Sequence, residues 1–345
     1  MAPRFGAFLF TSLFDGLDEA TVLSAALDYA RIAEETGFDD LWVSEHHFID
    51  YGITPSAIEL AGFLLGRTTA MRVGTAVVLL PQHPEVFVAE RAALLDHVSG
   101  GRFDLGVGRG GPSADLAVAG RGLEDWKAGV WPAVDRIREA WAGRAENPAV
   151  VGGTLTVRPR PRPGGDPPLL VAAVSDTSVD EAAARRLPML MFLHESDEAR
   201  RAKMARWSSV AVENGHDGAD PGHACALVGH VTEPGEDVAT VGDRLAEFLV
   251  SATSQYVLLP GAESSPAARL RGPDEVRTYV DTLLATHPIG TVEDCVARLS
   301  GVLADGGPQR VLLMLEAAAE PERVARNVAA FGTTVLPAVR EKLAP

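Results

Sequence analysis

The chain is poor in cysteine. Its 345 residues include only two, Cys225 and Cys295, so neither a disulfide framework nor a cysteine-rich metal site can be built from them. It also lacks any run of 18 apolar residues, and its first residues enter a strand-like segment without a charged leader or a long apolar stretch. We therefore expect a cytoplasmic protein with no membrane partner.

Basic residues are outnumbered. There are 31 lysines and arginines against 47 aspartates and glutamates, for a formal net charge of −16. Such an acidic chain repels phosphate backbones, so we expect no nucleic-acid partner. The 46% hydrophobic content is ordinary for a globular protein and is sufficient for a large core.

Short apolar runs alternate with longer segments of helical periodicity along almost the whole chain. This βα alternation predicts a parallel sheet covered by helices, and eight such units suit a closed (β/α)8 TIM barrel better than an open, doubly wound sheet. We therefore expect residues 1–345 to form one α/β barrel domain. The expected strands are 5–10, 39–43, 72–79, 103–107, 169–174, 189–193, 224–231 and 311–315.

Three segments interrupt the regular alternation. Residues 150–157 predict a small β-hairpin with Gly152 and Gly153 at its turn. Residues 123–143 predict one long helix. Residues 251–274 are rich in glycine, proline and serine, which predicts a mobile lid loop inserted into the barrel.

Active sites of such barrels lie at the carboxyl ends of the strands. Four expected strands are followed by polar or glycine-rich residues, namely 44–48, 81–84, 106–111 and 175–178. We therefore expect the functional site where these four segments meet.

The first of these segments contains Glu45, His46 and His47. Neighbouring side chains at a strand end point in opposite directions, so the two histidines are poorly placed to grip one metal ion, and we expect no metal site. A histidine here suits general acid–base chemistry, because its ordinary pKa lies near neutrality. Packing of a hydrogen-bonded histidine in the core explains the pattern equally well.

Residues 106–111 read Gly-Val-Gly-Arg-Gly-Gly, which matches the spacing of a dinucleotide-binding loop. That motif requires a helix to open at once, whereas Pro112 and Ser113 follow here. The better interpretation is a glycine-rich turn that lets a ligand approach the backbone, with Arg109 providing a positive charge that binds a phosphate. A tight turn with a structural arginine remains open.

Residues 175–178 read Ser-Asp-Thr-Ser between an expected strand and an expected helix. Their hydroxyls and free amides suit helix capping, and the same groups can bind a phosphate. Asp176 opposes an anion unless its side chain turns away.

Taken together, these segments resemble bacterial luciferase and its flavin-dependent monooxygenase relatives. The resemblance is carried, in order, by residues 41–48, 74–81, 93–103, 106–110, 187–189 and 287–295. It covers most of the chain.

The resemblance implies a monooxygenase that takes reduced FMN as a cosubstrate from a separate flavin reductase. It would react with O₂ through a peroxyflavin to oxygenate a small organic substrate. It implies His46 as the catalytic residue, a cis peptide at Ala76-Val77 beneath the flavin, and a homodimer formed through helices of the first half. The implied cofactor-binding residues are Glu45, Ala76, Gly108, Arg109, Gly110, Ser175, Thr177 and Ser178.

Two positions depart from the light-emitting subunit of that family. Gly108 replaces a cysteine and Val174 replaces a glutamate, which argues against luminescence and against a long-chain aldehyde substrate. Two other functions stay open: a deazaflavin-dependent oxidoreductase on the same barrel, and a non-catalytic flavin-binding partner subunit.

Overall fold

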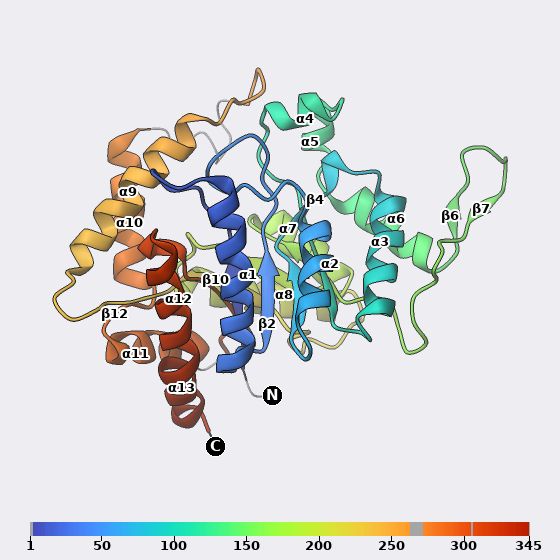
Figure 1. Ribbon diagram of the computed structural model, residues 1–345. Helices are drawn as coiled ribbons and strands as arrows, with labels where there is room; N and C mark the ends of the chain where they lie inside the picture. The colour runs from blue at the N-terminus through green and yellow to red at the C-terminus, as the bar shows by residue number, and fades with distance from the viewer. Residues whose placement is uncertain (1–2, 263–271, 305, 345) are drawn as a thin grey trace.

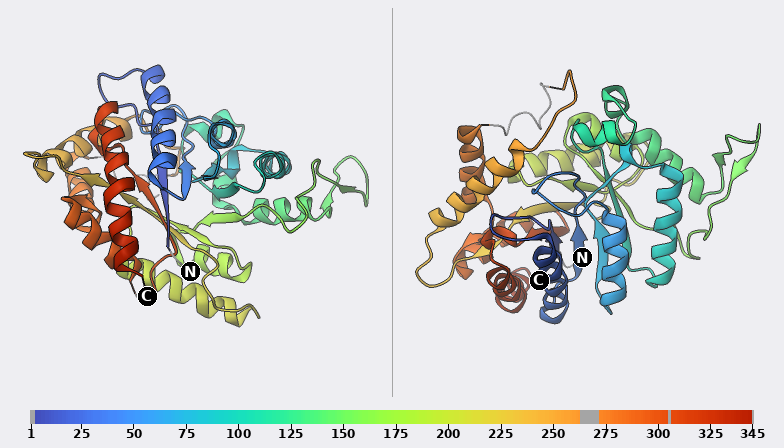
Figure 2. Two further views of the ribbon diagram at one scale, coloured as in Figure 1. Left: turned by 60° about the horizontal axis from the view of Figure 1, so that its bottom comes forward. Right: turned by 45° about the horizontal axis from the view of Figure 1, so that its top comes forward.

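Eight parallel strands close into a barrel in the computed structural model, which describes residues 3–262, 272–304 and 306–344. Each strand pairs with its neighbours in parallel register, and pairing of β3 with β5 and of β1 with β13 closes the ring. The expected TIM barrel is confirmed (Figures 1 and 2). In barrel order the strands are β1 (Arg4–Leu9), β2 (Asp40–Val43), β3 (Arg72–Thr75), β5 (Phe103–Gly108), β8 (Leu169–Ala172), β9 (Met189–Met191), β10 (Ala224–Val228) and β13 (Arg310–Met314).

Helices surround the strands. The first begins where Asp18 accepts a hydrogen bond from the Thr21 amide, and ends where Gly37 takes the left-handed conformation (φ 93°). No helix in the described part of the chain is long and apolar enough to cross a membrane. The longer helices are α1 (Glu19–Thr36), α2 (Ala57–Arg67), α3 (Glu85–Val98), α6 (Trp131–Trp141), α7 (Asp176–Ala184), α8 (Asp197–Glu213), α9 (Val238–Ser254), α10 (Pro273–Thr286), α11 (Val292–Leu303), α12 (Pro321–Ala330) and α13 (Leu336–Lys342).

The single helix expected over residues 123–143 is wrong. The chain forms α5 (Leu123–Lys127) and then α6, with the short α4 (Ala114–Val118) before them. Gly129 takes a positive φ of 77°, which ends one helix, and Pro132 stands in the first turn of the next.

The expected hairpin is present, but its strands are displaced. β6 (Ala145–Glu146) pairs antiparallel with β7 (Thr154–Leu155), so Val150 lies in the turn and not in a strand. The Val150 amide donates to the Asn147 carbonyl and Gly152 has φ 70°, which makes the connection longer than a two-residue glycine turn. The hairpin projects from the barrel (Figure 1).

The boundaries expected for the lid loop are also wrong. Helix α9 continues to Ser254, and α10 begins at Pro273. Between them, Leu258 forms an antiparallel bridge with Ser113, and the Leu259 amide donates to the Pro112 carbonyl at 2.8 Å. Residues 263–271 of the expected lid lie outside the described residues, so closure of a lid stays a prediction.

The inside of the barrel is filled around Trp42, which is fully buried. Gly6 and Gly74 on the two flanking strands make room for its indole, because a Cβ on either would lie within 2.6 Å of an atom of that ring. Phe8, Leu190 and Leu312 pack in the same apolar cluster. The barrel is therefore a packed core, and a ligand can enter only at its rim.

A network of ion pairs closes the opposite, amino-terminal end of the strands. The buried carboxylate of Asp40 pairs with Arg4 and with Arg310 Nε at 3.4 Å, while Asp104 pairs with Arg72 and with Arg310 Nη1 at 3.1 Å. Burial raises the pKa of Asp40, although the arginines oppose this shift. The network satisfies charges that would otherwise be costly to bury.

We expect Asp104→Ala to lower the free energy of unfolding by about 3 kcal/mol, since it leaves Arg72 without its buried carboxylate and Arg310 with Asp40 alone. Asp180→Ala is the matched control, because Asp180 pairs with Arg206 at an exposed site and should matter little. Urea unfolding of both variants measures the difference. Equal effects would show that the network adds no more than a surface pair.

Candidate active site at the carboxyl ends of the strands

Four of the segments expected to form the site lie side by side. His46, Ala76, Arg109 and Ser175 follow β2, β3, β5 and β8, which are consecutive neighbours around the barrel. All four strands run in the same direction, so their carboxyl ends share one rim. The structure thus brings the expected site residues to one half of that rim.

His46 lies in an aromatic surrounding. Its ring is 5.0 Å from that of Tyr51 and 5.8 Å from that of Phe10, centre to centre. Its Nδ1 is buried without a hydrogen-bond partner in the described part of the chain, and it faces Gly52, where a Cβ would lie 2.5 Å away. Burial lowers the pKa of His46 to about 4, although Glu45 opposes the shift. The imidazole is therefore neutral near pH 7 and can accept a proton.

Glu45 points away from His46 and is engaged by protein groups. Its Oε1 accepts hydrogen bonds from the Leu79 amide (3.0 Å) and His83 Nε2 (2.8 Å), and its Oε2 accepts one from the Ala57 amide (3.0 Å). Burial alone would raise the pKa of Glu45, but these bonds outweigh it and the pKa is lowered. Glu45 thus joins the end of β2 to the start of α2 and to the segment after β3.

A cavity of about 150 Å³ opens beside His46. One side is polar, because Asp115 accepts hydrogen bonds from Ser113 Oγ and Gln82 Nε2, both at 2.5 Å. The remaining lining is largely apolar and aromatic. The cavity is lined by His46, His47, Phe48, Ile49, Leu79, Ser113, Ala114, Asp115, Gln255, Tyr256 and Val257.

Sequence reasoning missed Asp115, Gln255 and Tyr256. Asp115 belongs to the short helix α4, which was not expected, and the other two residues stand about 200 positions after His46 in the segment between α9 and α10. Gln255 and Tyr256 lie within residues 251–274, which were expected to form a lid, but neither was expected as a site residue.

The peptide between Ala76 and Val77 is cis, as expected. The Val77 side chain lies against Gly108, where a Cβ would be 2.5 Å from Val77 Cγ2. Gly110 takes a positive φ of 69°. Gly108 thus makes room for the Val77 side chain, and Gly110 supplies the turn that follows β5.

Arg109 stacks on an indole. Its guanidinium carbon lies 3.7 Å from the centre of the Trp126 ring, and its Nη1 is 3.5 Å from the Trp126 carbonyl oxygen. Among the described residues no carboxylate pairs with it. Desolvation lowers the pKa of Arg109 without an opposing acid.

The serines after β8 cap α7. Ser175 Oγ accepts from the Ser178 amide at 3.2 Å, and Ser178 Oγ accepts from the Ser175 amide at 2.9 Å, which confirms capping. Thr177 lies exposed in the first helical turn. Asp176 lies 3.5 Å from Arg206, so its carboxylate is already paired with a cation. Capping does not exclude a phosphate here, because the exposed hydroxyls and the start of the helix remain accessible.

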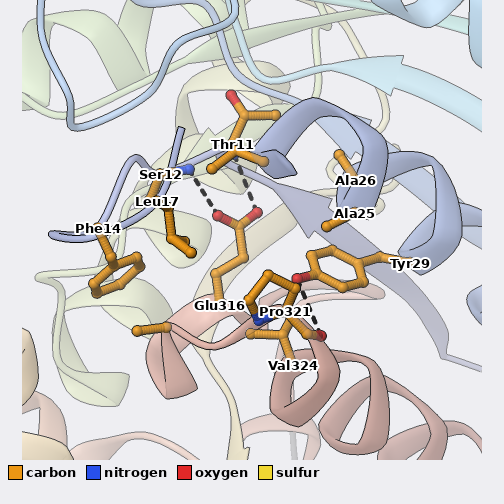
Figure 3. Close-up of a pocket in the computed structure, with 12 residues that line it drawn as sticks. Thr11, Ser12, Phe14, Leu17, Ala25, Ala26, Tyr29, Glu316, Pro321 and Val324 are labelled. Atoms are coloured by element: carbon orange, nitrogen blue, oxygen red, sulfur yellow. Dashed lines mark hydrogen bonds between the residues drawn. The ribbon is translucent and has the colours of Figure 1, made fainter. Parts of the chain in front are cut away.

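A second, smaller cavity of about 20 Å³ lies near the start of α1 (Figure 3). The buried carboxylate of Glu316, just after β13, accepts hydrogen bonds from the amides of Phe10, Thr11 and Ser12 at 2.8–3.1 Å. Burial raises the pKa of Glu316, although these bonds oppose it. The space holds about one water molecule, so we interpret it as a structural joint.

No group of three or more histidine, cysteine or acidic side chains within residues 3–262, 272–304 and 306–344 is arranged to hold a metal ion.

A family model described as luciferase-like monooxygenase matches residues 3–310. The chain belongs to the luciferase-like monooxygenase family. This family member is 26% identical over 364 residues to the alkanal monooxygenase alpha chain of Photorhabdus luminescens, with 98% of each chain covered. It is 30% identical over 349 residues to 4-hydroxyprotoasukamycin monooxygenase of Streptomyces nodosus subsp. asukaensis, with 96% of this chain and 91% of that one covered.

Solved structures share the barrel. A monooxygenase from Streptomyces bottropensis superposes with a TM-score of 0.77 at 22% identity, covering 97% of this chain and 99% of that one. The TM-score is 0.74, at 18% sequence identity, for an F420-dependent secondary alcohol dehydrogenase. It is 0.73, at 17% identity, for the oxygenating constituent of 3,6-diketocamphane monooxygenase from Pseudomonas putida in complex with FMN. For both, 98% of this chain and 99% of the other are covered.

Gly52→Ala should disturb His46 directly, because the added methyl would lie 2.5 Å from His46 Nδ1 and 2.7 Å from the Phe10 carbonyl oxygen. We expect a loss of about 1–3 kcal/mol of stability and a shifted imidazole NMR signal. Gly66→Ala is the control, since Gly66 lies in α2 with open space at its Cβ and should gain stability. An unshifted His46 signal in Gly52→Ala would contradict the proposed contact.

Proposed function

We propose that this family member is an FMN-dependent monooxygenase that uses reduced FMN and O₂ to oxygenate a small organic substrate. The observation that carries the proposal is a half-buried, neutral His46 beside a cavity, on the same rim as an arginine that lacks a carboxylate partner among the described residues. Family membership supports oxygenase chemistry, and a structural relative titled as an FMN complex supports the cofactor.

The residues at the rim fit a flavin with a phosphate tail. Arg109 would hold the phosphate by charge-assisted hydrogen bonds, and Ser175, Thr177 and Ser178 would add hydroxyl and amide donors. Gly108, Gly110 and Ala76 would line the ring, with the Val77 side chain packed over Gly108. Reduced FMN, when bound, would supply the electrons that activate O₂.

His46 would hold or accept a proton next to the reacting atoms. Its low pKa keeps it unprotonated at neutral pH, and the aromatic rings around it exclude water. Glu45 would act behind it, as a support for the segments that form the site. Asp115 offers an acceptor on the polar side of the cavity, where a substrate hydroxyl or amine would bind.

A second candidate is hydride transfer with a deazaflavin, because a structural relative is titled as F420-dependent. A third is a flavin-binding subunit that does not turn over. Anaerobic titration with reduced FMN, followed by mixing with air and absorbance recording, separates the three. Rapid reaction of the bound flavin with O₂ and product release support the monooxygenase. Binding without turnover supports the partner subunit.

His46→Ala should slow turnover by about 100-fold or more, since a positioned proton acceptor is lost, while FMN affinity changes little. The wild-type rate should stay flat between about pH 5 and pH 7 and fall only as the pH drops through about 4, where His46 becomes protonated. Stopped-flow absorbance measures the rates. Unchanged turnover in His46→Ala would rule out this role, and a wild-type rate lost below about pH 6.5 would contradict the lowered pKa of His46.

Supply of reduced FMN by a separate flavin reductase and a cytoplasmic location complete the proposal. We also propose a homodimer through α2 and α3. Their outer sides expose large apolar residues. Proteins that stay monomeric seldom expose several such residues on one face. These are Phe63, Phe87, Leu94 and Val98.

Phe87→Glu should therefore shift the protein from dimer to monomer in light scattering coupled to gel filtration, because a charge would be buried at the contact. Val151→Glu is the control, since Val151 is exposed in the hairpin turn, away from α2 and α3. A monomeric wild type would contradict the dimer.

A further inference from the structure

Arg109 is held in a particular way by its neighbour Trp126. The guanidinium lies over the indole at 3.7 Å, so the stack uses its flat face. The N–H donors of a guanidinium lie in its plane and point outward from the edge. Apart from one long contact to the Trp126 carbonyl at 3.5 Å, no hydrogen bond in the described part of the chain engages that edge.

Trp126 is itself fixed to the loop that carries Arg109. Its indole Nε1 donates to the Gly110 carbonyl at 2.9 Å, and its amide donates to the Gly122 carbonyl at 3.2 Å. Asp125 accepts a hydrogen bond from the Gly122 amide at 2.7 Å and so caps the short helix. Hydrogen bonds therefore hold Trp126 both to the glycine loop that carries Arg109 and within α5.

The orientation of the Arg109 guanidinium matters because the start of α7 follows the neighbouring strand. β5 pairs with β8 through Val107 and Val171, so Arg109 and the capped start of α7 follow adjacent strands. A phosphate between them would meet an arginine edge on one side and Ser175 and Ser178 on the other. A two-bond contact to phosphate requires the guanidinium plane to be set in advance, because the side chain is otherwise free to rotate.

We infer that Trp126 is a positioning residue for phosphate recognition: it holds the Arg109 guanidinium with its donor edge free, and so makes the site select FMN over riboflavin. The inference rests on the proposed FMN function and adds a residue that the sequence motif does not contain. Trp126 acts through Arg109 and does not touch the reacting atoms.

The test compares two flavins that differ only in the phosphate. Fluorescence titration of wild type, Trp126→Leu and Trp126→Phe gives the Kd for FMN and for riboflavin. We expect Trp126→Leu to weaken FMN binding about tenfold and Trp126→Phe to weaken it only two- to threefold, because the phenyl ring keeps the stack but loses the bond to Gly110. Riboflavin binding should stay within about twofold in both variants.

A double-mutant cycle identifies the route. In an Arg109→Ala background, Trp126→Leu should add little further loss of FMN affinity, since the arginine that it positions is gone. Trp131→Leu is the matched control, because Trp131 lies beneath Arg185 at 5.1 Å on the outer helices and should leave both Kd values unchanged.

The possible failures are distinguishable. Equal weakening of FMN and riboflavin in Trp126→Leu would mean that the indole merely supports the loop, and would overturn the inference. Unchanged FMN affinity in that variant would overturn it as well. If the wild type bound FMN no better than riboflavin, the proposed phosphate site would itself be wrong and the inference would fall with it.

Discussion

All eight strands of the barrel run parallel, and this constraint places every loop that follows a strand on one rim. Residues far apart in the chain, such as His46 and Ser175, therefore come to the same place without any local signal for their approach. The opposite rim carries the ion pairs of Asp40 and Asp104, which support the fold. Chemistry and support are thus separated by the direction of the strands.

Two buried glutamates hold the loops at the carboxyl ends of the strands in place, and both do so by accepting hydrogen bonds from backbone amides. Glu45 accepts hydrogen bonds from two amides and His83, and Glu316 accepts three from the amides of Phe10, Thr11 and Ser12. A buried carboxylate is costly unless its oxygens are satisfied, so each requires its donors to stay in place. Glu45 immediately precedes His46, so the support and the proposed proton acceptor share one turn of backbone. This explains why the acidic residue next to the proposed proton acceptor can be structural.

The strands, the barrel and the cis peptide at Ala76-Val77 could be predicted, because periodicity fixes elements and the resemblance fixes local geometry. The prediction of one helix over 123–143 was wrong because Gly129 ends the first helix and Pro132 begins the next. The spacing of apolar residues continues across this interruption and so does not reveal it. The cavity residues Asp115 and Tyr256 could not be predicted, since one lies in an unexpected helix and the other reaches His46 only through tertiary packing. The stacking of Arg109 on Trp126 could not be predicted either, because it is a tertiary contact between the end of a strand and a helix 17 residues later.

The glycine at position 108 shows how one small residue shapes the proposed flavin site. Its φ is not positive, so any residue could adopt the backbone there; what excludes a side chain is Val77, whose Cγ2 would lie 2.5 Å from a new Cβ. Val77 thus fills the space that a cysteine at 108 would need in this chain. In this chain the rim next to the cis peptide is apolar valine where light-emitting relatives are expected to present a thiol. The packing of Val77 against Gly108 is the physical basis on which we propose a substrate different from theirs.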